Sequence, residues 1–161
     1  SHLHCRGVLK FERLSDQGLL GVERELHSAF SNLVMNAIRY SPEGSVIEVK
    51  WRMGAEGQGI FSVTDQGIGI DSKHIPFITQ RFYRVDSARN QSKSGTGLGL
   101  AIVKHVLQRH GAALEIDSVP GEGSTFRCIF PSGRMSLSAE GEVSPQNSHE
   151  TETPKSLNRA V

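Results

Sequence analysis

Two hydrophobic periodicities stand next to each other in this chain. Between residues 23 and 40 apolar side chains recur three and four positions apart, which predicts an α-helix with one apolar face. That stripe comprises Val22, Leu26, Phe30, Leu33, Val34, Ala37 and Ile38. The following stretch, VIEVKWRM, alternates strictly and predicts a strand with Ile47, Val49, Trp51 and Met53 on one face. A helix and a strand that are each apolar on one side bury those sides against each other, so the pattern predicts a two-layer fold.

The remaining elements extend these two layers. GIFSVTD, which ends on Asp65, and the hairpin formed by ALEIDS, PGEG and STFRCIF predict further strands. Residues 98–110 predict a second amphipathic helix, capped by Gly111, and a short helix is expected near residues 74–81. VLKF and GLLGV, both within residues 1–22, are candidates for short strands. The predicted fold class is α+β: a two-layer sandwich whose mixed, mostly antiparallel sheet carries helices on one face.

The chain divides into a periodic part and a polar part. Residues 1–131 carry nearly all of the apolar periodicity and are expected to form one domain, whereas residues 132–161 are rich in Ser, Glu, Thr and Pro. Such a composition buries too little apolar surface to offset its chain entropy, so a polar disordered tail is expected.

The composition argues against several classes of function. With 18 basic and 17 acidic residues the formal net charge is +1, which predicts neither a nucleic-acid partner nor contact of this segment with a membrane. No apolar run approaches the roughly 18 residues that a membrane span needs. Cys5 and Cys128 lack metal-ligand spacing, and two free thiols are expected.

A row of polar residues accompanies the apolar stripe of the first helix. Asn32, Asn36 and Tyr40 stand four positions apart and share one face, with Arg39 beside them. An asparagine carbonyl oxygen can ligate Mg²⁺, a hard ion that usually shares the oxygens of a phosphate. The alternative is an ordinary exposed polar face.

The turn DQGIGI places a carboxylate at the end of a strand. Asp65 can accept a hydrogen bond from an exocyclic amine, while Gly67 and Gly69 let the backbone close around a flat ring. A plain turn between two elements is the alternative, because Asp and Gly are common turn residues.

Glycines at alternate positions, Gly95, Gly97 and Gly99, open the second predicted helix. Helix N-termini favour anions, so this string predicts a phosphate site, with a flexible loop as the alternative. It is neither a dinucleotide fingerprint, since no strand precedes it, nor a P-loop, since no Gly-Lys-Ser/Thr follows. Arg81 and Arg84, in RFYRVD, carry guanidinium groups that can donate two hydrogen bonds to phosphate oxygens. The alternative is that they are surface charges on a loop anchored by aromatic residues.

The order of these motifs resembles one family. NLVMNAIRYSPEG, DQGIGI, RFYRVD, GTGLGLAIVK and PGEGSTF follow one another as in the catalytic ATP-binding domain of sensor histidine kinases, within the Bergerat-fold superfamily. The resemblance covers roughly residues 8–131. SNLVMNAIRYSPEGS and HIPFITQRFYRVDSARNQSKSGTGLGLAIVKH are most similar to the phosphate-regulon branch of that family.

The resemblance implies a metal and phosphate site. Asn36 is expected to hold Mg²⁺ against the phosphates of ATP, with Asn32 supporting the same site and Arg39 contacting phosphate. Arg81 and Arg84 are candidates for contact with the γ-phosphate and complete the implied catalytic set. The implied phosphate cradle consists of Gly95, Thr96, Gly97, Leu98, Gly99 and Leu100.

The resemblance also implies a site for the base. Tyr40 is expected to pack near the adenine or ribose, and Asp65 to accept a hydrogen bond from the adenine amino group. The other residues implied in this pocket are Gly67, Gly69, Ile70 and Thr125.

Two other functions are compatible with parts of this pattern. Related ATPases and serine kinases carry a glutamate as general base four residues before the metal-binding asparagine, where this chain has Asn32. Because a carboxamide does not accept a proton at neutral pH, the histidine kinase is favoured. A binding module that has lost ATP is the third hypothesis, and the intact asparagines, aspartate and glycines argue against it.

The implied partners are the dimerisation and histidine-phosphotransfer domain of the same kinase and a response regulator downstream. The domain is expected to be the cytoplasmic part of an inner-membrane protein. HETETP, from His149, matches the spacing of the family's phosphoacceptor box but has no amphipathic helix around it, so it is interpreted as a coincidence.

Overall fold

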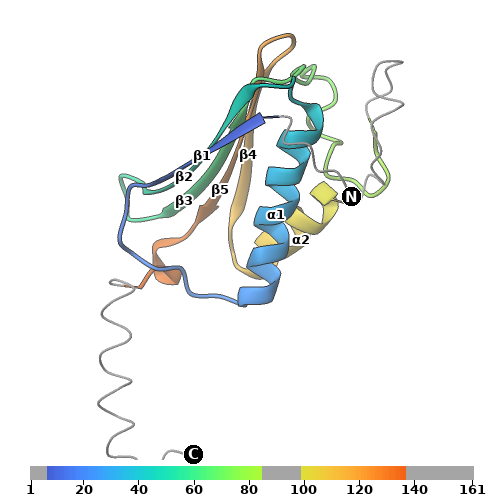
Figure 1. Cartoon of the computed structure of the whole chain (residues 1–161). Helices are drawn as coiled ribbons and strands as arrows, with labels where there is room; N and C mark the ends of the chain where they lie inside the picture. Colours follow the sequence, from blue (N-terminus) through green and yellow to red (C-terminus); the bar gives the residue numbers. More distant parts are fainter. Residues whose placement is uncertain (1–6, 85–98, 137–161) are drawn as a thin grey trace, which may run out of the picture.

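The computed structural model describes residues 7–84 and 99–136 of the chain. Within them, five strands form one sheet and two α-helices cover one of its faces (Figure 1). In chain order the elements are β1 (Gly7–Arg13), α1 (Glu23–Tyr40), β2 (Ser45–Met53), β3 (Gly59–Asp65), α2 (Gly99–Arg109), β4 (Ala113–Val119), β5 (Gly123–Phe130) and a 3-10 turn (Ser132–Arg134). This arrangement confirms the predicted α+β two-layer sandwich.

The sheet is mixed, in the strand order β1-β2-β3-β5-β4. β1 pairs with β2 in parallel, and the other three pairs are antiparallel. Strand β3 therefore occupies the centre, between β2 and β5, and its C-terminal end lies beside the hairpin that joins β4 to β5. This neighbourhood brings the aspartate–glycine turn next to the last hairpin.

The core lies between the helices and one face of the sheet. Alternate residues of the central strands point toward the helices, and α1 contributes one buried stripe. The buried members include Leu26, Ala29, Leu33, Ala37, Ile47, Val49, Val63, Phe126, Cys128 and Phe130. Burial raises the pKa of the Cys128 thiol to about 12, so this cysteine is an inert core residue.

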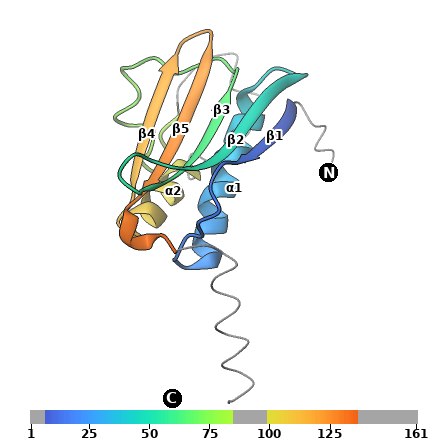
Figure 2. The ribbon, with the colours of Figure 1, turned by 90° about the vertical axis from the view of Figure 1, so that its left-hand side faces the viewer.

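The opposite face of the sheet points away from the helices (Figure 2). Its outward-facing side chains are mostly polar, and they include Glu12, Lys50, Thr64 and Arg127. Ion pairs lie on this face. The Lys50 ammonium is 3.7 Å from a carboxylate oxygen of Glu12 on the neighbouring strand β1, and 3.9 Å from one of Glu48 on its own strand. Arg127 on β5 pairs with Glu115 and Asp117 on the neighbouring strand β4. The sheet is therefore half-buried, as the strict alternation of VIEVKWRM predicts.

Three expectations differ from the structure. Residues 74–81 form successive turns with hydrogen bonds from residue i to i−3, such as Phe77 N–H to His74 O, and not an α-helix. Pro76 accounts for this, because it lacks an N–H and disfavours helical geometry at the residue before it. GLLGV is not a strand, and only Leu19 forms an isolated bridge, with Met135. Ordered structure also extends to Ser136, beyond the expected boundary at 131.

The two helices pack against each other on the same side of the sheet (Figure 1), from Asn32 and Gly99 to Glu25 and Arg109. No helix among the described residues combines the length and the apolar character needed to cross a membrane.

Candidate nucleotide-binding site

The polar row of α1 meets the start of α2. The Asn32 side-chain amide donates a hydrogen bond to the Ser28 carbonyl at 2.8 Å, which turns its Oδ1 in the other direction. That oxygen lies against Gly99, the first residue of α2, because a Cβ atom added there would be 2.9 Å from it. Asn36 follows one turn later and is half-buried. The structure thus brings Asn32 of the asparagine row next to Gly99, the last glycine of the string.

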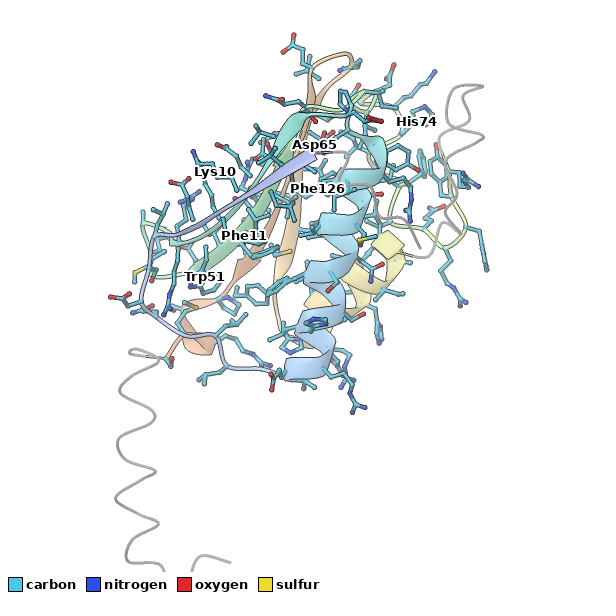
Figure 3. All side chains as sticks on the ribbon, viewed as in Figure 1. Lys10, Phe11, Trp51, Asp65, His74 and Phe126 are labelled. Carbon is cyan, nitrogen blue, oxygen red and sulfur yellow. The ribbon has the colours of Figure 1, made fainter. Side chains whose placement is uncertain are left out.

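Asp65 forms the floor of a second region, at the end of β3 and near the end of α1 where Tyr40 lies (Figure 3). It is 7% exposed, and its Oδ1 accepts a hydrogen bond from the Gly67 backbone amide at 2.8 Å. Burial raises the pKa of the Asp65 carboxyl above its ordinary value, and hydrogen bonds from the backbone amides of Gly67 and Ser124 oppose that rise. A buried carboxylate with free acceptor capacity suits a ligand that brings N–H groups.

Close backbone contacts require the glycines of this turn. A Cβ atom on Gly67 would overlap the carbonyl oxygen of Tyr40, at the end of α1. Gly69 has φ +74°, and a Cβ atom there would overlap the carbonyl of Val119 in the hairpin. The turn is therefore packed tightly between the first helix and the last hairpin, so its conformation is determined by both.

Thr125 is not brought to Asp65. Because side chains alternate along β5, Thr125 points to the polar face of the sheet, where its hydroxyl lies 3.0 Å from that of Thr64. Ser124 is the residue in register with Asp65, and it is 7% exposed. The sequence could have identified Ser124. Phe126, Cys128 and Phe130 are apolar at alternate positions and so define the inner face, and the same alternation places Ser124 on that face.

Ser118, on β4, is a further residue that the sequence analysis missed. Its Oγ lies 2.7 Å from the Ser124 Oγ and accepts a hydrogen bond from the Ile70 amide at 2.7 Å. Ile70 and Leu100, both expected in the site, are half-buried and pack against the core. No short-range pattern connects Ser118 to Ile70, since 48 positions separate them.

Arg81 and Arg84 lie on the surface. The Arg81 guanidinium carbon is 5.5 Å from the centroid of the exposed Phe82 ring, and Arg84 is also exposed. Tyr83 is the aromatic residue that anchors this segment, because it packs against the core and its hydroxyl lies 2.6 Å from Nδ1 of His74. Arg39 is half-buried on α1. Gly95, Thr96, Gly97 and Leu98 lie outside the described residues.

The described residues contain no group of three or more His, Cys, Asp or Glu side chains that could hold a metal ion. The oxygen ligands that this region offers are carboxamides, at Asn32 and Asn36. A neutral donor set of this kind suits Mg²⁺ when phosphate oxygens complete the coordination.

Residues 21–134 match the model of one protein family, the histidine kinase-, DNA gyrase B- and HSP90-like ATPases. The chain belongs to this family. The match includes α1, the turn after β3, α2 and the β4–β5 hairpin, which are the elements that build the site described above.

Relatives within the family are sensor histidine kinases. The chain is 60% identical over 112 residues to the phosphate regulon sensor protein PhoR of Pseudomonas aeruginosa, which is 70% of this chain and 25% of that protein. It thus spans about a quarter of that relative's length. Among solved structures, the mycobacterial sensor histidine kinase MprB has a TM-score of 0.65 at 31% identity, covering 76% of this chain and 81% of that one. Full-length ShkA, in complex with AMPPNP, has the same fold, with a TM-score of 0.70 at 24% identity over 83% of this chain and 27% of that one.

Proposed function

We propose that this domain binds Mg²⁺-ATP and transfers the γ-phosphate to a histidine on a separate dimerisation and histidine-phosphotransfer domain of the same kinase. The observation that carries the proposal is the buried Asp65, held at the base of a glycine turn that α1 and the last hairpin enclose. This geometry supports recognition of a flat base that has an amino group. The asparagine row of α1, which meets the start of α2 at Gly99, supports the placing of the phosphates there.

Each region has its own part in binding. Asp65 would accept an N–H of the adenine amino group, while Gly67, Gly69 and Ile70 would line the ring, with Tyr40 near the adenine or ribose. Asn36 would supply a carboxamide oxygen to Mg²⁺, and Asn32 would support it. The metal, when bound, neutralises phosphate charge, which lowers the cost of bringing a nucleophile to the γ-phosphate. Arg39, Arg81 and Arg84 would contact phosphate, and residues 95–100 would cradle it.

The proposed acceptor is a histidine because the site lacks its own general base for water. At the position of Asn32 a carboxylate would activate water, but the amide there donates to the Ser28 carbonyl and cannot take a proton. Positioning and charge stabilisation supply most of the catalysis of phosphoryl transfer. The attacking nitrogen and its activation are therefore expected on the partner domain.

Phosphate-starvation signalling is the proposed context, and a response regulator is the proposed final recipient of the phosphoryl group. The 60% identity with PhoR of Pseudomonas aeruginosa supports this proposal. The domain is expected to act on the cytoplasmic side of an inner-membrane protein, without contacting nucleic acid. The second candidate function is ATP hydrolysis or the phosphorylation of serine, because the matching family also includes ATPases of the gyrase B and HSP90 type.

The test is a transfer assay with γ-labelled ATP and two components, this chain and a separately produced dimerisation domain. We expect acid-labile phosphate on the added domain, lost when its acceptor histidine is replaced by alanine and also when Asp65→Asn is introduced here. The chain alone should bind ATP without labelling itself, so His149→Ala should change nothing. Rapid release of inorganic phosphate by the isolated chain, with no labelled protein, would support the ATPase instead.

A further inference from the structure

A hydroxyl group on β4 connects the aspartate–glycine turn to the residue opposite Asp65. Ser118 lies on the inner face of β4, in register with Ser124 of β5. Three polar neighbours surround its Oγ: the Ile70 amide at 2.7 Å, the Gly123 carbonyl at 3.0 Å and the Ser124 Oγ at 2.7 Å. This arrangement determines where the hydroxyl hydrogens can point.

A serine hydroxyl has one hydrogen to donate and two lone pairs that accept. The Ile70 amide can only donate, and the Gly123 carbonyl can only accept. All three contacts are satisfied when Ser118 donates to Gly123 and accepts from both Ile70 and the Ser124 hydroxyl. In the reverse arrangement, with Ser118 donating to Ser124, the Gly123 carbonyl loses this partner, at a cost.

The first arrangement directs the Ser124 hydrogen away from the ligand region and toward Ser118. Ser124 then offers only lone pairs, next to the Asp65 carboxylate with which it is in register. An ionised carboxylate is also only an acceptor. This end of the site therefore favours a ligand group that carries N–H hydrogens and disfavours a carbonyl oxygen.

We propose that Ser118 is a positioning residue that sets the polarity of the Ser124 hydroxyl and thereby helps the site to select a 6-amino purine over a 6-oxo purine. The inference rests on the proposed binding of an adenine nucleotide. It assigns part of the base selectivity to a residue that does not contact the base, beyond the contribution of Asp65.

Contacts other than those of the Ser118 hydroxyl also hold the aspartate–glycine turn against the hairpin. The turn and the hairpin are also joined by a hydrogen bond from the Gly121 amide to the Ile68 carbonyl at 2.7 Å. Gly69 packs against the Val119 carbonyl as well. Removal of the Ser118 hydroxyl should therefore leave the turn attached to the hairpin, while the Ser124 hydrogen becomes free to rotate.

The test compares ATP with inosine triphosphate, which has a carbonyl in place of the amino group. Calorimetry gives the two dissociation constants for the parent chain, Ser118→Ala and Ser118→Thr. We expect Ser118→Ala to reduce the preference for ATP by about tenfold, since the freed Ser124 hydroxyl can donate to the inosine carbonyl. Ser118→Thr keeps a hydroxyl and should retain the preference. Thr64→Val removes a hydroxyl contact of the same kind on the other face of the sheet and serves as the matched control.

A double-mutant cycle adds a second criterion. If Ser118 acts through Ser124, then Ser124→Ala and the double variant should show the same preference for ATP, because no hydroxyl remains to be oriented. A Ser118→Ala chain that loses affinity for both nucleotides by one factor, with the preference intact, would overturn the inference and leave ATP binding in place. A parent chain that binds neither nucleotide would overturn the proposed function and this inference with it.

Discussion

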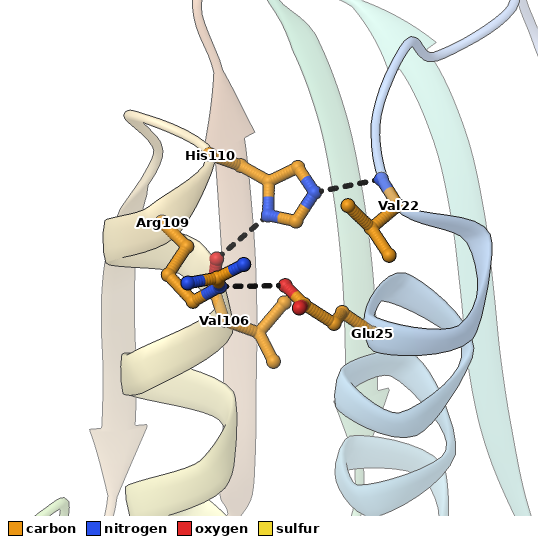
Figure 4. A network of polar contacts seen from close by, with 5 residues as sticks. All are labelled: Val22, Glu25, Val106, Arg109 and His110. Atoms are coloured by element: carbon orange, nitrogen blue, oxygen red, sulfur yellow. Dashed lines mark hydrogen bonds and ion pairs between the residues drawn. The ribbon is translucent and has the colours of Figure 1, made fainter.

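The imidazole of His110 accepts a hydrogen bond from the backbone amide of Val22 at 3.0 Å and so joins the end of α2 to the start of α1 (Figure 4). Its other nitrogen, Nδ1, lies 2.8 Å from the carbonyl of Val106 and donates to it, which defines a neutral ring. The ring is 2% exposed, and the ion pair of Arg109 with Glu25, at 3.0 Å, lies beside it on the surface. The buried histidine thus supplies an acceptor at the N-terminus of α1, where Val22 has no capping side chain.

Replacing His110 with alanine should destabilise the domain by about 2 kcal/mol, because the Val22 amide loses its acceptor and the loss of the buried ring leaves a cavity. The Val106 carbonyl still accepts the backbone N–H of residue 110. His105, which is exposed on α2, is the matched control, and His105→Ala should change the free energy of unfolding by less than about 0.5 kcal/mol. Urea denaturation measures both. Coinciding midpoints for His110→Ala and the parent chain would show that the contact contributes nothing.

Substitutions at Gly69 and Gly44 distinguish the conformational cost of a side chain at positive φ from the cost of steric overlap. Both have positive φ, +74° and +82°, but a Cβ atom at Gly44 meets nothing within 4 Å, whereas one at Gly69 overlaps the Val119 carbonyl. Gly44→Ala should therefore cost only the conformational penalty, about 1 kcal/mol. Gly69→Ala should cost clearly more in urea denaturation and should also weaken ATP. Equal losses of stability would mean that the hairpin yields without cost.

Local patterns predicted most of the fold. The spacing of apolar residues predicts a helix over residues 23–40, and α1 has these bounds, because its periodicity depends only on residues a few positions apart. Strict alternation predicts β2 for the same reason. The prediction was wrong over residues 74–81, where Pro76 interrupts a pattern that apolar spacing alone suggests is helical.

The site was only partly predictable. Asp65 and the glycines stand out because they lie within six positions of one another at the end of a strand. The contacts of Ser118 with Ile70 and of His110 with Val22 span 48 and 88 positions, and they depend on the strand order and on helix packing. A single sequence contains neither arrangement, so these polar contacts required the structure.

Asp65, the proposed partner of the adenine amino group, should lower the stability of the folded domain at neutral pH. Burial raises the pKa of this carboxyl above its ordinary value, 3.8, so the folded state disfavours the ionised form. Its contribution to stability is present below the unfolded-state pKa and is lost as the pH rises through the folded-state pKa. Asp65→Asn should therefore unfold at a higher temperature than the parent chain at neutral pH, and the difference should vanish below about pH 4.

The same substitution should weaken ATP strongly, because the amide replaces a charged acceptor and adds donors that face the adenine amino group. Thermal unfolding from pH 3 to 8, together with calorimetry at neutral pH, measures both effects. A variant that is less stable than the parent at neutral pH would show that the backbone amides of Gly67 and Ser124 outweigh the cost of burial.

Asn36 should make ATP binding depend on Mg²⁺. Asn36→Ala removes the proposed oxygen ligand and leaves a good helix former, so the fold should persist while the affinity for ATP becomes the same with Mg²⁺ and with EDTA. Asn36→Asp keeps an oxygen ligand and should retain part of the dependence. His27→Ala, at an exposed position of the same helix, is the control. Unchanged Mg²⁺ dependence in Asn36→Ala would place the ligand elsewhere.

The C-terminal boundary of the stable domain should lie after Ser136. Met135 pairs with Leu19 and packs against Gly59, and Ser136 exchanges hydrogen bonds with Gly18, at 3.0 Å from its amide and 3.1 Å to its hydroxyl. A chain of residues 1–136 should therefore match the parent in thermal stability and ATP affinity. A greater stability of the parent would show that residues 137–161 contribute to the fold.

A chain that ends at Arg134 loses the contacts of Met135 and Ser136 and should lose about 2 kcal/mol of stability. Its affinity for ATP, measured well below the unfolding temperature, should stay unchanged. The reason is distance: Gly59 and Asp65 occupy opposite ends of β3, so about 20 Å of strand separates the lost contacts from the base site. A parallel loss of ATP affinity in the folded chain would show that the two ends of the sheet are coupled.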